Sequence, residues 1–220
     1  MAHVTRCAVT LALAGVVLAG CSGSEDSSST GPTAVPGSAT DGSTDGPTDG
    51  GTPLADVDTT ALVVPRAPFC DLVDPAAVTR ALGQEAADVS EHRSGQRIRI
   101  SDDVADVVHE FGCRWTAGDD TAEAWVFAPP VTRARAAALV RDVRDAAGCA
   151  DPPAAPAFGR PSAACLSREQ GAATMTFQGL YGDAWLSCSL TLAGKADREV
   201  GDRATRWCAA VATGAAGSGG

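Results

Sequence analysis

Six cysteines in the last two thirds of the chain are the residues whose chemistry is easiest to interpret. None of them forms a C-x-x-C pair, so neither a thioredoxin-like redox site nor a zinc knuckle is indicated. An even number of cysteines predicts disulfides in a domain that lies outside the cytoplasm, and six cysteines allow fifteen connectivities. The predicted disulfide cysteines are Cys70, Cys113, Cys149, Cys165, Cys188 and Cys208.

The surroundings of these cysteines favour one of the fifteen pairings. Cys149 and Cys165 bracket a proline-rich segment, and joining them would close a loop of about 15 residues. Cys188 faces inward on a predicted strand and Cys208 lies on the buried stripe of a predicted helix, so this pair would staple helix to sheet. The two cysteines that remain then pair with each other: Cys70 and Cys113.

Two histidines follow the first twenty residues and are the next candidates for chemistry, His92 and His109. His109 precedes a glutamate, but no second histidine follows at the spacing of a zinc protease. If residues 102–110 were helical, one face could hold a metal ion. The favoured interpretation is a solvated polar face opposite valines, so no metal ligands are predicted. The residues on this face are Asp103, Asp106, His109 and Glu110.

Three common catalytic or nucleotide-binding motifs are missing from the sequence. No G-x-S-x-G elbow, no P-loop and no dinucleotide fingerprint occurs. If all six cysteines are bridged, no thiol nucleophile remains. The sequence therefore predicts no catalytic or cofactor-binding residue and a protein that is not an enzyme. Because a triad assembled in space needs no sequence motif, an enzyme stays an alternative.

The charges divide unevenly along the chain. Residues 22–62 carry seven acidic side chains and no basic one, whereas residues 63–220 carry twenty acidic and sixteen basic ones. Most of the acidity therefore belongs to the first segment. The scattered and balanced charges of the second indicate solubility rather than nucleic-acid binding.

The N-terminus has the pattern of an export signal. A single basic residue, Arg6, precedes 13 apolar residues at positions 7–19, too few to span a bilayer. The sequence Leu18-Ala19-Gly20-Cys21 then resembles the bacterial lipobox, in which the cysteine becomes a lipidated N-terminus. That resemblance implies acyl chains on Cys21 and a location at the cell membrane, on its extracytoplasmic face. The alternative is an ordinary secretory signal with a chance cysteine.

A segment rich in Gly, Ser, Thr, Pro and Asp follows the lipobox. It has neither helical nor strand periodicity, and its low hydrophobicity predicts a disordered tether. Three aspartates in it lack the alternating spacing of an EF-hand loop. We therefore predict a signal peptide (1–20), a lipidated cysteine and linker (21–65), one globular domain (66–213) and a flexible tail (214–220).

Hydrophobic periodicity predicts three helices and several strands in the domain. The helices cover 75–82, 133–147 and 197–212, the first with Asp74 as N-cap and Gly83 as its end. Strands at 111–116 and 121–128 form a hairpin, and others are predicted at 173–177, at 184–192 and near 98–100. This order predicts an α+β domain, a curved antiparallel sheet packed with about three helices and stapled by disulfides.

Two short motifs in this domain resemble a known family. The sequence Cys70-Asp71-Leu72-Val73-Asp74-Pro75, continuing to Leu82-Gly83, and the later Cys113-Arg114-Trp115 are similar to actinobacterial lipoproteins with the domain of unknown function three-five-five-eight. The resemblance covers roughly residues 66–212. It carries no catalytic residues over to this chain. It implies an extracytoplasmic module of the sensor or ligand-binding type.

These observations lead to three functional hypotheses. The first is a membrane-anchored, non-enzymatic module that binds a small ligand, glycan, lipid or envelope protein. The second is a hydrolase of envelope material, which needs a cleft where His92 or His109 meets carboxylates. The third is a structural or assembly lipoprotein of a membrane complex. A deep apolar pocket would favour a small ligand, and an exposed apolar patch would favour a protein partner.

Overall fold

The computed structural model describes residues 50–101, 104–152 and 154–217. The predicted signal peptide, Cys21, the linker up to residue 49 and Asp103 lie outside these residues. None of the helices in the described part is both long enough and apolar enough to cross a membrane.

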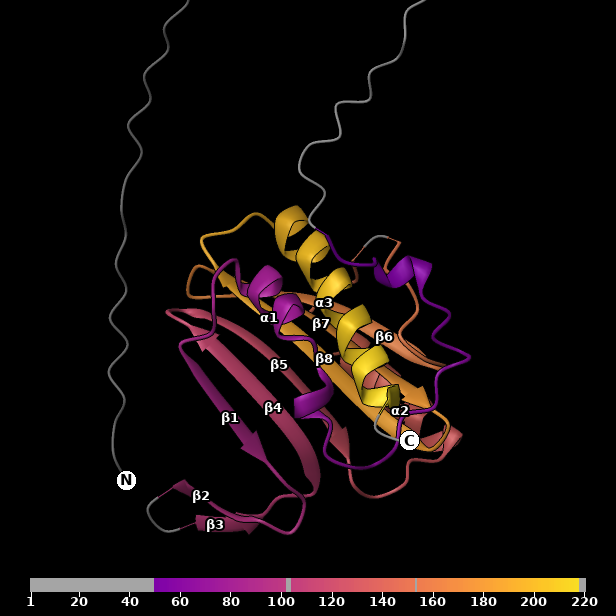
Figure 1. Ribbon diagram of the computed structural model, residues 1–220. Coiled ribbons are helices and arrows are strands. Elements are labelled where there is room, and N and C mark those ends of the chain that lie inside the picture. The colour runs from indigo at the N-terminus through magenta and orange to yellow at the C-terminus, as the bar shows by residue number, and fades with distance from the viewer. Residues whose placement is uncertain (1–49, 102–103, 153, 218–220) are drawn as a thin grey trace, which may run out of the picture. The chain divides into compact units, whose positions relative to one another are not determined.

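Six strands form one open sheet, and all of its pairings are antiparallel (Figure 1). The order across the sheet is β1-β4-β5-β8-β7-β6, which leaves β1 and β6 as its edges. Alternating apolar residues define the inner face, most regularly in β8. The strands are β1 (Asp88–His92), β4 (Glu110–Ala117), β5 (Asp120–Phe127), β6 (Ser162–Glu169), β7 (Ala172–Tyr181) and β8 (Ala184–Ala193).

A separate hairpin of β2 (Arg97–Ser101) and β3 (Val104–Val107) connects β1 to β4. The helix considered for residues 102–110 is therefore wrong. The segment is rich in valine, and β-branched residues favour a strand paired with the isoleucine-containing β2. The polar face that such a helix would have presented is not formed. Among the described residues, no three His, Cys, Asp or Glu side chains are grouped closely enough to hold a metal ion.

Three α-helices pack against the sheet on both of its faces. They are α1 (Pro75–Leu82), α2 (Arg133–Arg144) and α3 (Asp197–Gly217). The first is bounded as predicted: the Asp74 side chain accepts a hydrogen bond from the backbone N–H of Ala76 at 2.9 Å, and Gly83 ends it at φ 78°. Helices α1 and α3 lie on the inner face, while α2 lies on the outer face over β6 and β7 (Figure 1).

The other two helices differ from the prediction at their ends. Helix α2 stops at Arg144, three residues early, because the residues that follow are exposed and have no core to contact. Helix α3 continues five residues beyond 212, so a flexible tail beginning at 214 is wrong. Its alanine-rich end still packs on the core, where Ala215 is fully buried.

The folded part also begins earlier than residue 66. A 3₁₀ helix, η1 (Leu54–Asp56), follows Pro53, and the side chains of Leu54 and Val64 are buried in the main core. The linker predicted up to residue 65 is therefore too long. Its last apolar residues are spaced irregularly, which hides them from a search for periodicity, yet Leu54, Val57, Leu62 and Val64 belong to or pack against the main core, and η1 contacts α3.

Three disulfides join the pairs that the sequence favoured. Cys188–Cys208 links β8 to α3, and Cys149–Cys165 ties the segment after α2 to β6. Cys70–Cys113 links a second 3₁₀ helix, η2 (Cys70–Leu72), to β4. All three closures fix a helix or a connecting segment to the sheet, which confirms the disulfide-stapled α+β fold.

The main core holds one polar group that has no partner. The Tyr181 side chain is buried against Phe158, with ring centroids 5.4 Å apart at 84°. Within the described residues its hydroxyl has no hydrogen-bond partner. Burial alone raises the pKa of this phenol far above its ordinary range, because a phenolate would be desolvated there.

Candidate functional site

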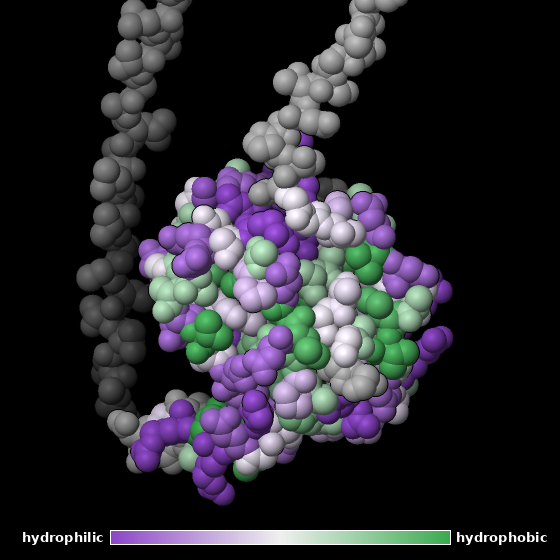
Figure 2. Space-filling view, viewed as in Figure 1, coloured by the Kyte–Doolittle hydropathy of each residue, from purple (hydrophilic) through white to green (hydrophobic). Residues whose placement is uncertain are grey.

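A cavity lies between α1, α3 and the segment 50–57, and we call it the helix groove. Its volume is about 570 Å³. Small and apolar side chains form its floor, so the two helices approach closely. Figure 2 shows the molecular face that α1 and α3 cover, where hydrophobic surface interrupts the hydrophilic surface. The floor includes Val57, Leu72, Ala77, Ala81, Trp207 and Ala210.

Three arginines stand on the rim of the helix groove. Arg80 pairs with Asp74 at 3.4 Å and Arg203 with Glu199 at 2.7 Å. Arg206 donates from Nη1 to the backbone carbonyl oxygen of Asp202 at 3.0 Å, and the described residues place no carboxylate within ion-pair distance of it. The rim therefore has an excess of positive charge, and Arg206 keeps donors for an anion.

Two glycines lie on the wall of the helix groove. A Cβ on Gly214 would stand 2.7 Å from the carbonyl oxygen of Leu72, so only glycine lets α3 approach η2 this closely. A Cβ added at Gly51 would stand 3.5 Å from Arg206 Cβ and 3.6 Å from Arg80 Nε, so the chain passes close to both side chains. The chain at Gly51 thus forms a wall between two of the rim arginines.

A second cavity, the edge groove, lies on the other side of α1, between it and β1. Its volume is about 490 Å³. Val78, Val89 and Trp115 are apolar lining residues, and no basic side chain lines it. The acidic side chains on its walls are Asp71, Glu85 and Glu91. Opposite signs of charge therefore mark the two sides of α1.

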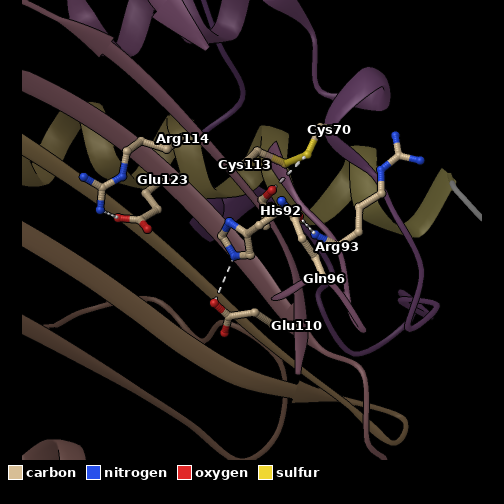
Figure 3. Close-up of polar contacts among 9 residues, drawn as sticks. Cys70, His92, Arg93, Gln96, Glu110, Cys113, Arg114 and Glu123 are labelled. Carbon is tan, nitrogen blue, oxygen red and sulfur yellow. Dashed lines mark hydrogen bonds and ion pairs between the residues drawn. A yellow bond between two sulfur atoms is a disulfide. The ribbon is translucent and has the colours of Figure 1, made fainter. Parts of the chain in front are cut away.

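The two candidate histidines do not meet each other or a groove. His92 Nε2 lies 2.9 Å from Glu110 Oε1 on the outer face of the sheet, and both side chains are half-buried (Figure 3). The His92 ring covers Gly112, where a Cβ would clash with it. His109 is exposed. Neither histidine lines the helix groove or the edge groove. The His92–Glu110 pair therefore holds β1 against β4 rather than forming a cleft.

The structure brings together residues that the sequence did not single out. In the sequence, Arg80, Arg203 and Arg206 are scattered charges, and the long separation of Arg80 from the other two hides their shared rim. Of the apolar floor beside them, only Ala81 and Trp207 lie on helix faces that the sequence predicts to be buried. The one usable signal was the spacing of Arg203 and Arg206, three apart beside the buried stripe of α3.

Comparisons with known proteins add little to this geometry. No protein-family model matches the chain, and a search of curated proteins finds no match. Among solved structures, the immunity protein TplEi of T6SS from Pseudomonas aeruginosa, complexed with "L" peptide, aligns with a TM-score of 0.25 and 16% identity. The alignment covers 60% of this chain and 62% of that one, less than two thirds of its length.

Proposed function

We propose that this chain is a lipid-anchored, extracytoplasmic binding protein without catalytic activity. Its ligand is a small anionic amphiphile that occupies the helix groove. The lipobox-like sequence before Cys21 supports the anchor, and three disulfides are typical of a compartment outside the cytoplasm. The short motifs at 70–75 and 113–115, which resemble those of actinobacterial lipoproteins, support the same assignment, although no family model matches the chain.

One observation carries the proposed ligand class: an apolar floor combined with a rim of three arginines. Cavities of 300–1,000 Å³ with a few convergent polar groups are typical of small-molecule sites, and the helix groove falls in this range. The floor favours a hydrocarbon portion. The guanidinium of Arg206 favours a carboxylate or phosphate, which it binds through two parallel N–H donors.

Calorimetric titration tests the ligand class with decanoate and decyl phosphate as probes. Both should bind saturably, with one site per chain, while inorganic phosphate and decanol should bind far more weakly. Removing the Arg206 charge in Arg206→Gln should weaken decanoate binding roughly tenfold or more, because a hydrogen bond to a charged group contributes about 1.5–3 kcal/mol.

Arg198→Gln is the matched control. Arg198 lies on the same helix, its side chain is 93% exposed and it does not line the helix groove. It should leave decanoate binding unchanged. If decyltrimethylammonium bound as tightly as decanoate, or if Arg198→Gln and Arg206→Gln weakened binding equally, the proposed ligand class would be wrong.

The anchor is tested separately by mass spectrometry of the protein purified from its native membrane without reductant. The expected mature N-terminus is acylated Cys21, with all six domain cysteines bridged. A Cys21→Ser variant should leave the membrane fraction. An unmodified Cys21 in the membrane-purified protein would contradict the anchor but would not affect the decanoate result.

A further inference from the structure

The two edges of the sheet differ in how far other segments of the chain cover them. At the β6 edge, Ala150 forms an isolated β-bridge with Leu166, and their backbone groups exchange two hydrogen bonds of 2.9 Å. The adjacent Cys149–Cys165 disulfide fixes this cover. The β1 edge has no such cover: in the described chain, β1 pairs only with β4 (Figure 1). An uncovered edge offers a row of unpaired N–H and C=O groups.

The inner face of β1 opens into the edge groove. Val89 lies opposite Trp115 and Glu91 opposite Cys113, so these two β1 side chains share the face that lines the groove. Val89 is 55% exposed, so more than half of this apolar side chain is open to a partner. Glu91 pairs with Arg93 at 3.4 Å in an exposed contact, which contributes little to stability.

Strand β1 is nevertheless held firmly in place. The His92–Glu110 contact joins β1 to β4 on the outer face (Figure 3). The Cys70–Cys113 disulfide fixes η2, which forms part of the groove wall, to β4. A preformed strand lowers the ordering cost that a second strand must overcome when it pairs with this edge. The edge is therefore accessible and already formed as a strand.

We infer that β1 is a docking edge for an extended, basic segment of a partner protein. The segment adds as a strand beside β1 and forms backbone hydrogen bonds with it, which is an established mode of peptide recognition. Because side chains alternate along a strand, every second residue faces the groove. One of these is apolar and contacts Val89, and the next is Lys or Arg and contacts Glu91, with Asp71 and Glu85 adding attraction.

This inference does not depend on the helix groove, which lies on the other side of α1. A second copy of this chain is the competing occupant of the edge. Pairing β1 with β1 would bring the acidic groove walls of both copies (Asp71, Glu85 and Glu91) toward each other, and the nearby base Arg93 is already paired with Glu91 of its own chain. Charge complementarity therefore favours a basic partner over self-association.

The probe is a blocked ten-residue peptide in which threonine alternates with lysine and valine. Binding is followed by fluorescence anisotropy of a labelled peptide, with decanoate absent and present. We expect saturable binding that weakens with salt and that decanoate does not displace. A peptide with glutamate for lysine should not bind, and one with N-methylated backbone at alternate residues should lose binding roughly tenfold or more.

Variants of the protein locate the site. Glu91→Lys should weaken peptide binding roughly tenfold, because a like charge replaces an attractive one. Glu169→Lys is the matched control: this acidic residue is exposed on the opposite edge strand, β6, and the substitution should have no effect. Hydrogen exchange should slow at β1 amides on peptide addition and stay constant at β6.

Several results would overturn the inference. Equal binding of the glutamate peptide would show that charge does not select the partner. Equal binding of the N-methylated peptide would show that no strand is added. A concentration-dependent dimer that Glu91→Lys disrupts, without any peptide binding, would assign the edge to a second copy of this chain.

Discussion

The two edges of the sheet show what this fold protects and what it leaves open. At the β6 edge, a backbone bridge and a disulfide cover the strand, and α2 packs over the outer face. At the β1 edge, no described segment pairs with the strand and four of its five residues are exposed. Because an uncovered edge invites association, a cover on one edge alone directs association to the other.

Disulfide removal near the β1 edge has the largest expected effect. Replacing Cys70 and Cys113 with alanine frees η2, which borders both grooves, from β4. The crosslink closes 43 residues, and the chain-entropy relation predicts a loss of roughly 4 kcal/mol in the free energy of unfolding. Urea denaturation measures it. A loss below about 1 kcal/mol would show that η2 stays in place without the crosslink.

Removing the disulfide at the β6 edge should lower the free energy of unfolding slightly less, but it should increase self-association of the chain more. Alanine at Cys149 and Cys165 opens a 16-residue closure, for a predicted loss of roughly 3 kcal/mol. Once the cover loosens, the amides of Ala150 and Leu166 should exchange faster. Analytical ultracentrifugation should then show self-association that the Cys70/Cys113 variant lacks. Monomeric behaviour of both variants would contradict a protective role for the β6 cover.

The smallest predicted effect concerns the contact that holds β1. His92→Ala removes the hydrogen bond to Glu110 and the ring over Gly112, and should lower the free energy of unfolding by about 0.5–1 kcal/mol. Amide exchange should rise in β1 and not in β6. His109→Ala, at an exposed histidine, is the control and should be neutral. Faster exchange in both edge strands would mean that His92 acts on the whole sheet.

Sequence patterns predicted the elements that carry clear local signals, such as a helix cap or a regular apolar alternation. Asp74 and Gly83 bound α1 as expected, and the alternation in β8 placed Cys188 toward Cys208. Both edge strands were missed. Strand β1 (DVSEH) is exposed on most residues and lacks an apolar face, and β6 (SAACLSRE) carries small residues at its buried positions.

The candidate sites were harder to predict than the fold. The helix groove combines Gly51, Arg80 and Arg206, which are distant in sequence and meet only because α1 and α3 pack side by side. No periodicity relates such residues. The edge groove depends on β1, whose pairing with β4 follows from the tertiary fold rather than from its own composition.

The buried Tyr181 gives the chain an intrinsic absorbance signal for unfolding at high pH. It is the single tyrosine of the sequence, so any tyrosinate absorbance comes from this side chain alone. Because burial raises its pKa, the Tyr181 phenol of the folded protein stays protonated above the ordinary tyrosine pKa of about 10. In the unfolded chain the same phenol ionises near that pH. Stability therefore falls as pH rises beyond that value. At alkaline pH, the increase in tyrosinate absorbance therefore reports global unfolding, without any added dye.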